Sequence, residues 1–473
     1  MKNIILYVFL LISVFQVTGC KKFLEAKSKE EIIPKTAIDL RELLLGNGYP
    51  QATSAYFHFL AMLDDDVQLN TASSQVGTTE IVARFPVYTW QPNLYDNTYT
   101  LPGLSGSLTS YELLYGWIRG CNAVLDYADD VTGTTEDVAR VKAEALALRA
   151  FHYYYLINLY GVPYNKDKSA AGVPLKLVSG LTENPIGRNT VQEVYHQMVK
   201  DLEEAISLFK AISVTRNDFR INLPAACILL SRVYLYMGEW DRSITSATLA
   251  AERGGALTNL TGQNAPYFIL DYNSSELAWN FGSQDVSFPP GFLPSPDLLS
   301  MYSEADVRSK LFFNNDQTLP AKYSNDFTVS KFGKGMRTAE AYLNRAEANA
   351  EKALKGDAAS LQAALSDLNL LRYNRIIGYS DVIINDANVL REEIRKERRK
   401  ELCFEDHRWF DLRRYGMPEI THTYKASAGS SVVTFTLKQN DPYYTLPIPD
   451  GMFNNNKLLT QNPSRSQAPR VGQ

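Results

Sequence analysis

Apolar residues recur at helical spacing through much of the chain. The two clearest runs are Val141, Ala145, Leu148, His152, Tyr155 and Leu159, and then Val191, Val194, Tyr195, Met198, Leu202, Ala205 and Phe209. Gly161 and Pro163 end the first run, and Thr190 with Glu193 forms a capping box before the second. The pattern predicts two long amphipathic helices in the first half of the chain.

Two later stretches, Ala226–Ala251 and Ala339–Asn369, resemble each other. Each has a helix with small residues on one face, a turn at Gly238 or Gly356, and a second helix of spaced alanines. Small residues allow paired helices to pack closely, as in tetratricopeptide repeats. We therefore predict a mainly α protein built on a tetratricopeptide-like helical-repeat scaffold.

Two other stretches, Asn70–Ser110 and Gly254–Gly335, lack a sustained helical period. Both are rich in turn-forming residues and aromatics. Long irregular segments in compact proteins are usually functional or disordered, and the aromatic content argues against disorder. We predict a large, loop-rich face with short helices and little β-structure; Val432–Leu437 near the end of the chain is the one strand-like run we single out.

The segment Arg391–Gly416 contains no Gly or Pro before Gly416, which predicts one long helix with a glycine stop. Asn388 is the expected N-cap. The segment carries a row of charges at Glu397, Glu401, Glu405, Arg408 and Asp411. Carboxylates spaced four apart share one helix face and repel each other by about 0.2–0.5 kcal/mol per pair.

Water or arginines must offset that repulsion. Trp409, Phe410 and Leu412 lie among the charges, which argues against a fully wet face. We predict a partly buried lattice of Glu and Arg side chains that fixes how the helix docks, with Arg408 next to Glu405. A solvated charged face is the alternative.

The N-terminus has the pattern of an export signal. Lys2 precedes an apolar run, Ile4–Val17, that is too short to span a bilayer. Val17-Thr18-Gly19-Cys20 resembles a bacterial lipobox, so we predict a signal peptide over residues 1–19, lipidation at Cys20 and a tether over residues 20–34. Two or more acyl chains on one residue would anchor the protein stably to a membrane. An ordinary signal peptide with a chance cysteine is the alternative.

The composition is that of a globular protein. Of 473 residues, 45% are hydrophobic and 21% charged, and the net charge of −4 leaves no basic footprint for nucleic acid. Cys121, Cys227 and Cys403 are isolated, which predicts core thiols. No residue spacing indicates a cofactor or metal, and the acidic run at 64–66 is expected to be a solvated turn rather than a Ca²⁺ site.

Aromatic residues are frequent: 28 Tyr, 21 Phe and 5 Trp. Such rings fill cores, but they also stack on flat apolar faces of ligands such as sugars. Trp90 and Trp279 lie in the irregular stretches beside polar residues. Our candidate ligand-binding residues are Trp90, Asn93, Tyr95, Asp96, Trp279, Asn280 and Tyr302. The alternative is that these rings pack loops against the core.

Several motifs resemble the SusD/RagB-like family. The pattern ER..EL..E..R..DL.R.G is matched by Glu397-Arg398, Glu401-Leu402, Glu405, Arg408, Asp411-Leu412, Arg414 and Gly416. Ala143–Pro163 and the closing Leu446–Pro449 with Gln461–Pro463 also resemble family segments. One departure is Asp406, where family members often carry Gly.

The resemblance implies a lipid-anchored protein of the outer membrane, facing outward, that binds an oligomeric nutrient. It implies an oligosaccharide ligand, or a peptide as in RagB-type relatives, and a SusC-like TonB-dependent transporter as partner. The expected regions are a helical part over residues 35–253 with a loop excursion at about 70–110, an aromatic-rich insertion over 254–336, and a C-terminal family region over 337–473.

We expect binding and hand-over rather than catalysis. Glu397 and Glu401 are one helical turn apart, a separation that also suits paired glycosidase carboxylates. Within an arginine-rich helix, however, such a pair is typical of a structural ion pair. An exported glycan hydrolase and a helical-repeat scaffold for envelope assembly remain as alternatives from other functional classes.

Overall fold

The structure is a computed structural model that describes residues 33–50, 59–95, 110–180, 184–212, 218–262, 268–282, 290–318, 321–322, 333–454 and 456–473. The predicted signal peptide, Cys20 and nearly all of the tether lie outside these residues. So does the candidate ligand residue Asp96.

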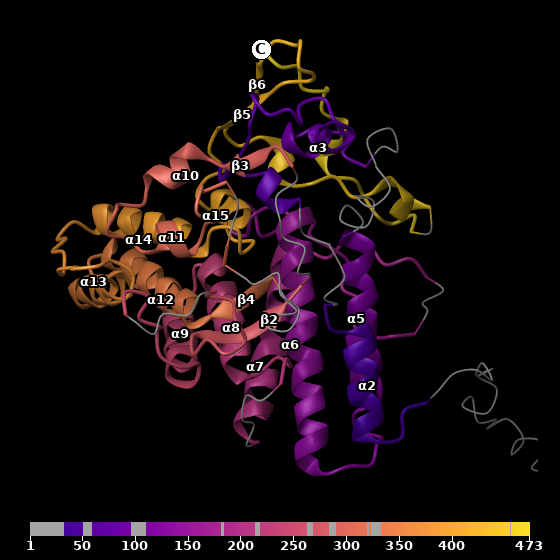
Figure 1. Cartoon of the computed structure of the whole chain (residues 1–473). Coiled ribbons are helices and arrows are strands. Elements are labelled where there is room, and N and C mark those ends of the chain that lie inside the picture. Colours follow the sequence, from indigo (N-terminus) through magenta and orange to yellow (C-terminus); the bar gives the residue numbers. More distant parts are fainter. Residues whose placement is uncertain are drawn as a thin grey trace, which may run out of the picture.

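Helices dominate the described residues (Figure 1). They are α2 (Ala37–Asn47), α3 (Thr79–Tyr88), α5 (Ser110–Tyr127), α6 (Thr135–Tyr160), α7 (Val191–Lys210), α8 (Leu223–Met237), α9 (Trp240–Arg253), α10 (Pro296–Ser300), α11 (Arg308–Leu311), α12 (Thr338–Ala353), α13 (Ala358–Tyr373), α14 (Ala387–Leu402) and α15 (Arg408–Arg414). Short 3-10 turns lie at Leu60–Met62, Pro442–Tyr444, Asp450–Phe453 and Pro463–Ser466. The prediction of a mainly α protein is confirmed.

The strands form three separate antiparallel pairs. They are β1 (Val67–Leu69) with β3 (Phe292–Pro294), β2 (Leu277–Phe281) with β4 (Lys334–Arg337), and β5 (Ile420–Tyr424) with β6 (Val433–Leu437). The predicted strand near the C-terminus is confirmed as β6. Its partner β5 alternates buried and exposed residues, a pattern that the sequence analysis missed.

Helix α6 is the centre of the fold. Thr134 caps its start by accepting a hydrogen bond from the Asp137 N–H, and every residue from 143 to 160 is buried. Helices α5 and α7 pack along its two sides, and α2 packs on α5 (Figure 1). Because α6 is enclosed by neighbours, its apolar residues surround the helix instead of forming a single stripe.

The predicted helical repeats are confirmed as two hairpins, α8 with α9 and α12 with α13. Gly238 and Gly356 adopt φ values of +77° and +96° at the turns, a region open to glycine. Helix α12 packs on α9, and α14 packs on α12, so the hairpins stack in series away from α6 (Figure 1). The capping box of Thr190 and Glu193 is also present.

The C-terminal segment predicted as one helix is instead two, α14 and α15. The backbone leaves helical geometry after Leu402, and Phe404 and Asp406 have φ of +62° and +66°. The N-cap prediction was also wrong, because Asp386 rather than Asn388 accepts the first backbone hydrogen bonds. The spacing of residues along the sequence does not reveal a positive φ, so the pattern predicted one continuous helix. Gly416 does stop the second helix, at φ +94°.

Helix α3, within Asn70–Ser110, was not predicted. It contains Pro86 near its C-terminal end, where proline usually signals a break. One large hydrophobic cluster joins residues from Leu40 to Leu459, so the N-terminal and C-terminal regions share a core. The proposed boundaries at residues 253 and 336 stay predictions. None of the helices in the described ranges has the length and apolarity that crossing a bilayer requires.

Candidate functional site

Glu397 and Glu401 of α14, with Glu405 just beyond its end, lie at the centre of a buried ion-pair network. The exposed fractions of Glu397, Glu401 and Glu405 are 0%, 0% and 4%. Glu401 accepts hydrogen bonds from Arg308 at 2.9 Å and Arg337 at 2.7 Å. Further contacts complete the network: Arg375 with Glu401 and Glu276, Arg308 with Asp306 and Glu397, Arg372 with Glu397, and Arg337 and Lys322 with Glu405.

These cations keep the glutamates ionised. Burial alone would raise the pKa of Glu397, but Arg308, Lys400 and Arg372 lower it to about 2. The same balance, with burial opposed by Arg375, Arg337 and Arg308, holds the pKa of Glu401 well below its usual range. Carboxylates fixed in this state and shut away from solvent cannot donate a proton to a glycosidic oxygen. The network therefore positions α14 against three other segments.

Arg408 does not pair with Glu405, contrary to the prediction. Its guanidinium contacts the Asp65 carboxylate at 2.6 Å, because the break after α14 turns α15 away from the glutamate row. Asp411 instead pairs with Arg398 at 2.9 Å and with Arg414 at 2.8 Å.

The acidic run at 64–66 is not the solvated turn we expected. Asp64 and Asp66 are buried, and ligand atoms of the three carboxylates lie within 4.8 Å of one another. Arg399 contacts Asp66 at 2.7 Å, in addition to the Asp65–Arg408 pair. Arg399 and Arg408 thus form ion pairs with carboxylates of this cluster. These pairs join the N-terminal region to α14 and α15.

The structure contradicts the tryptophan platform. Trp90 is 0% exposed, its Nε1 donates to the Leu63 carbonyl at 3.0 Å, and its ring stacks on His422. Trp279 is 2% exposed and packs on Phe151 and Phe281. Neither ring offers a free face to a sugar, because Trp279 lies in the buried strand β2 and Trp90 follows the end of α3 into the core.

The remaining candidates have mixed positions. Asn280 is buried and donates to the Leu270 carbonyl at 3.0 Å, so it is also excluded as a ligand contact. Tyr302 is half-buried and donates to the Lys400 carbonyl at 2.8 Å. Asn93 and Tyr95 are half-buried, and the Tyr95 hydroxyl is bonded to that of Tyr160. Their role in binding stays a prediction.

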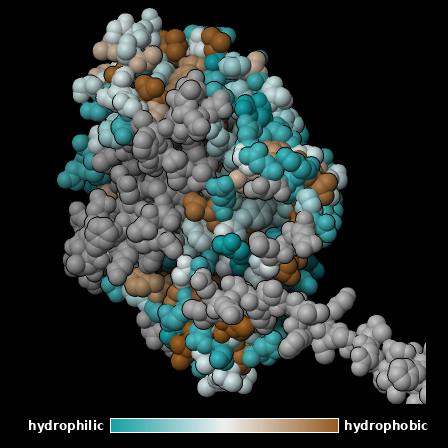
Figure 2. All heavy atoms as spheres, turned by 90° about the vertical axis from the view of Figure 1, so that its right-hand side faces the viewer, coloured by the Kyte–Doolittle hydropathy of each residue, from teal (hydrophilic) through white to brown (hydrophobic). Residues whose placement is uncertain are grey.

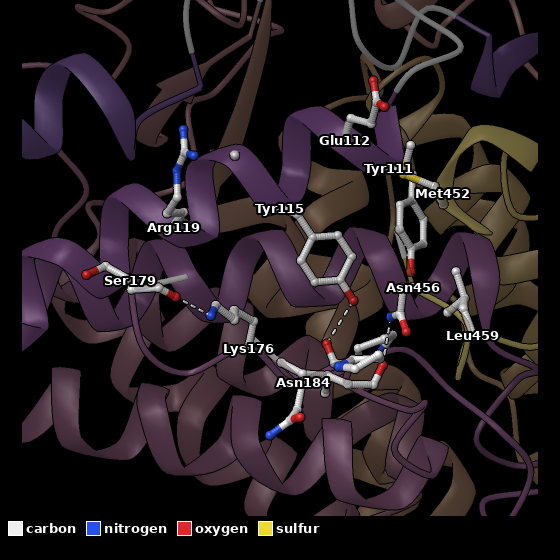
Figure 3. A pocket seen from close by; sticks show the side chains of 15 residues that line it. Tyr111, Glu112, Tyr115, Arg119, Lys176, Ser179, Asn184, Met452, Asn456 and Leu459 are labelled. Carbon is white, nitrogen blue, oxygen red and sulfur yellow. Dashed lines mark hydrogen bonds between the residues drawn. The ribbon is translucent and has the colours of Figure 1, made fainter. Parts of the chain in front are cut away.

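A pocket of about 620 Å³ lies beside α5 instead (Figure 3). Its walls come from α5, from residues within 174–180 and 184–186, and from residues 452, 456 and 459 of the C-terminal tail. It is lined by Tyr111, Glu112, Tyr115, Gly116, Arg119, Pro174, Lys176, Ser179, Gly180, Asn184, Pro185, Ile186, Met452, Asn456 and Leu459. Figure 2 views the molecule from the side on which α5 lies, and its coloured hydrophobic atoms form small patches among polar ones. A pocket lined mainly by apolar surface, with a few polar groups, is typical of sites that bind small ligands.

Two tyrosines form one side of the pocket. The ring centroids of Tyr111 and Tyr115 are 5.0 Å apart, and the Tyr115 hydroxyl donates to the Pro174 carbonyl at 2.8 Å. Burial raises the pKa of Tyr111 to about 12 and that of Tyr115 further, so both hydroxyls are neutral at physiological pH. Tyr115 is half-buried and keeps part of its surface open to the pocket.

Gly116 is a glycine inside α5 that no packing contact explains. A Cβ placed there would have no heavy atom within 4 Å, whereas a Cβ at Gly120, one turn later, would lie 2.2 Å from the Asn47 carbonyl oxygen. Gly120 is thus required by the packing of α2 on α5. Glycine in a helix interior is less stable than alanine by about 0.5–1 kcal/mol. Among the described residues no side chain lies against Gly116, which lines the pocket, so the glycine exposes the helix backbone there.

The pocket wall is held in place by hydrogen bonds. Arg188 donates to the carbonyl groups of Gly172, Ala171, Tyr160 and Thr460. Asn456 donates to the Ile186 carbonyl at 2.8 Å. These bonds fasten the 171–188 segment to α6 and to the tail, so the pocket is formed before any ligand arrives. A helical pattern interrupted by a glycine beside two tyrosines is the signal that could have revealed this site in the sequence.

Comparison with known proteins shows which families the sequence of this chain resembles. The sequence model of the SusD family matches residues 304–464, and a second, described as "Starch-binding associating with outer membrane", matches residues 22–235. The chain is SusD-like in both halves. Among its relatives are SusD-like proteins P38 and P2 of Formosa agariphila, 23% and 21% identical; the matches cover 87% and 78% of this chain and 91% and 82% of the relatives.

Solved SusD structures share the fold. A SusD-like carbohydrate binding protein from Bacteroides vulgatus superposes with a TM-score of 0.68 at 23% identity, covering 90% of this chain and 98% of that one. A SusD superfamily protein from Bacteroides thetaiotaomicron gives 0.69 at 24% identity, covering 90% and 100%. In this SusD-like chain Asp406, the departure noted from the family motif, has φ +66°, the region that favours glycine.

Proposed function

We propose that this protein binds an oligosaccharide at the outer membrane and passes it to a TonB-dependent transporter, with no bond made or broken. Similarity to the SusD family supports the ligand class, and the second family description associates such proteins with the outer membrane. Cys20 would carry the lipid anchor, and the folded part would face outward. Digestion of intact cells with an added protease tests that orientation, since a protein facing the periplasm would be protected.

The observation that carries the proposal is the pocket beside α5. A sugar ring has apolar C–H faces that pack on aromatic rings and hydroxyl groups that need polar partners. In the pocket, the Tyr115 ring can pack on the apolar face of a sugar. Asn184, Ser179 and Asn456 can form hydrogen bonds with its hydroxyl groups. Gly116 adds a stretch of bare helix against which a ring can lie flat.

The experiment is affinity electrophoresis or pull-down with a panel of polysaccharides and their oligosaccharides. Tyr115→Ala removes the ring, and Gly116→Gln fills the open space beside the helix backbone. We expect each variant to weaken retention by about tenfold, since a lost aromatic contact of about 1.4 kcal/mol changes affinity by that factor. Tyr373→Ala, on the exposed face of α13, is the matched control and should bind as the wild type does.

Two results would contradict the proposal. If both pocket variants retain glycans as the wild type does, the site lies elsewhere on the protein. If no polysaccharide is retained but peptides are, the ligand class is wrong. Co-purification of a TonB-dependent transporter with the tagged full-length protein tests the partner, and its consistent absence would remove the hand-over step.

A further inference from the structure

We propose that the pocket beside α5 takes an acidic sugar, one that carries a carboxylate or a sulfate ester. This inference rests on the proposed function and specifies its ligand. It begins with the charges of the lining residues. Two of them, Arg119 and Lys176, are cations, and one, Glu112, is an anion.

The two cations are available to a ligand. Arg119 is exposed and forms no ion pair with any residue that the structure describes. Lys176 uses one of its three donors on the Gly180 carbonyl, at 2.5 Å, and no described carboxylate contacts its Nζ. Most other cations along the chain are engaged: the arginines around α14 all meet carboxylates. Arg119 and Lys176 differ from these arginines in having no described carboxylate to neutralise them.

A third cation lies behind the wall. Arg188 is half-buried, close enough to Tyr111 and Tyr115 to affect their pKa values, and its hydrogen bonds all go to backbone carbonyls. No described carboxylate neutralises it. Its charge therefore adds to the positive potential on the pocket side of α5.

The carboxylates that the structure describes near the pocket do not cancel this potential. Glu112 precedes Arg119 by seven residues on α5, which separates their backbones by roughly 10 Å along the helix axis. That distance exceeds the Debye length of about 8 Å at physiological ionic strength. Asp126 accepts hydrogen bonds from the Ser179 N–H and hydroxyl and does not line the pocket. The protein as a whole carries a net charge of −4, so the positive charge at this pocket is opposite in sign to the net charge of the protein.

The arrangement matches the chemistry of an acidic sugar. A carboxylate or sulfate accepts two hydrogen bonds from the planar guanidinium of an arginine, and an ammonium adds a second charge-assisted bond. Figure 3 shows Arg119 and Lys176 at the end of the pocket marked by Ser179, with Glu112 toward the end marked by Met452. The ring could then rest on Tyr115 and Gly116 while its acidic group meets the two cations.

The test is isothermal titration of the full mature protein with three probes of matched length. These are a neutral cello-oligosaccharide, an oligogalacturonate and a sulfated carrageenan oligosaccharide. We expect at least one acidic probe to bind at least tenfold more tightly than the neutral one, and this advantage to shrink as salt rises. The two acidic probes separate a carboxylate from a sulfate ligand.

Variants identify the pocket as the source of the preference. Arg119→Gln and Lys176→Gln should each weaken binding of the acidic probe by about tenfold, a larger loss than either variant causes for the neutral probe. Glu112→Gln, at the other end of the pocket, should change binding of the acidic probe much less than either cation variant. Lys355→Gln, at the exposed turn between α12 and α13, makes the same change in net charge away from the pocket and should have no effect.

The outcomes are distinct. Equal binding of neutral and acidic probes, reduced by Tyr115→Ala but unchanged by Arg119→Gln and Lys176→Gln, would overturn the charge preference and leave glycan capture intact. If Lys355→Gln reduces the acidic preference as much as Arg119→Gln does, the preference comes from the overall charge of the protein. That result would overturn the proposed site. Failure of all three probes, together with failure across the polysaccharide panel, would remove the proposed function itself.

Discussion

At the scale of single residues, the two glycines inside α5 illustrate how packing and function are told apart. Both lie on a helix, where glycine is unfavourable. At Gly120 the Asn47 backbone leaves no room for a side chain, whereas at Gly116 the space is open. A residue that lowers stability without any packing reason is a candidate for a functional role.

Alanine substitutions at these glycines should therefore have opposite effects on stability. We expect Gly116→Ala to raise the free energy of unfolding by about 0.5–1 kcal/mol, because it removes the helix penalty of glycine. Gly120→Ala should lower it by about 1–3 kcal/mol through overpacking against α2. Denaturant midpoints measure both. A loss of stability in Gly116→Ala would mean that the open space beside it is occupied in solution.

At the scale of elements, the break between α14 and α15 decides which charges meet. Phe404 and Asp406 hold positive φ values, and the Asp406 carboxylate contacts Lys334 at 2.5 Å. The Tyr155 hydroxyl also lies 3.3 Å from that carboxylate. An aspartate thus occupies a backbone conformation that favours glycine, and its side chain makes contacts that glycine cannot make.

Substitutions at Asp406 separate these two effects. Both Asp406→Gly and Asp406→Ala should destabilise the protein, because each leaves the Lys334 ammonium without its partner. The glycine variant should be the more stable of the two by about 1 kcal/mol, since only alanine suffers the left-handed backbone penalty. Thermal unfolding of the two variants measures the difference. Equal midpoints would show that the backbone relaxes at this position.

At the scale of the whole molecule, the network around Glu401 ties together segments that lie far apart in the chain. Arg308 comes from the irregular region, Arg337 from the end of β4, and Arg375 from the residues that follow α13. Removing one partner from a buried pair is strongly destabilising, because the other charge is left buried alone. The network therefore makes the C-terminal half depend on every segment that supplies a charge.

Acid should weaken this network in a predictable range. The pKa of Glu397 is about 2 in the folded protein and about 4.5 without these contacts, so its contribution is complete above pH 4.5 and is lost as the pH falls toward 2. Glu397→Gln should lower the free energy of unfolding by about 3 kcal/mol at pH 6, and the gap to the wild type should narrow below pH 4.5.

Denaturant midpoints between pH 6 and pH 3.5 measure that gap. Glu392→Gln is the matched control on α14, since the Glu392 side chain is 52% exposed and should contribute little at any pH. A gap for Glu397→Gln that stays constant down to pH 3.5 would contradict the assignment of an ionised, arginine-bound Glu397.

The sequence by itself determined the long helices α6 and α7, the hairpins of α8–α9 and α12–α13, the capping box at Thr190 and the resemblance to the SusD family. These features depend on residues three or four positions apart, or on motifs read directly from the chain, so no distant contact is needed to recognise them. The glutamate row of α14 was also recognisable as a set of charges that something must neutralise.

Only the tertiary structure decided which cations neutralise the row of glutamates and where a ligand can enter. Arg308 and Arg337 are 93 and 64 residues from Glu401, and spacing along the chain cannot select among distant arginines. Trp90 and Trp279 follow polar loop sequences into the core, because burial depends on what packs around a segment. The pocket beside α5 has walls from three separate parts of the chain, so it exists only once the fold has brought them together.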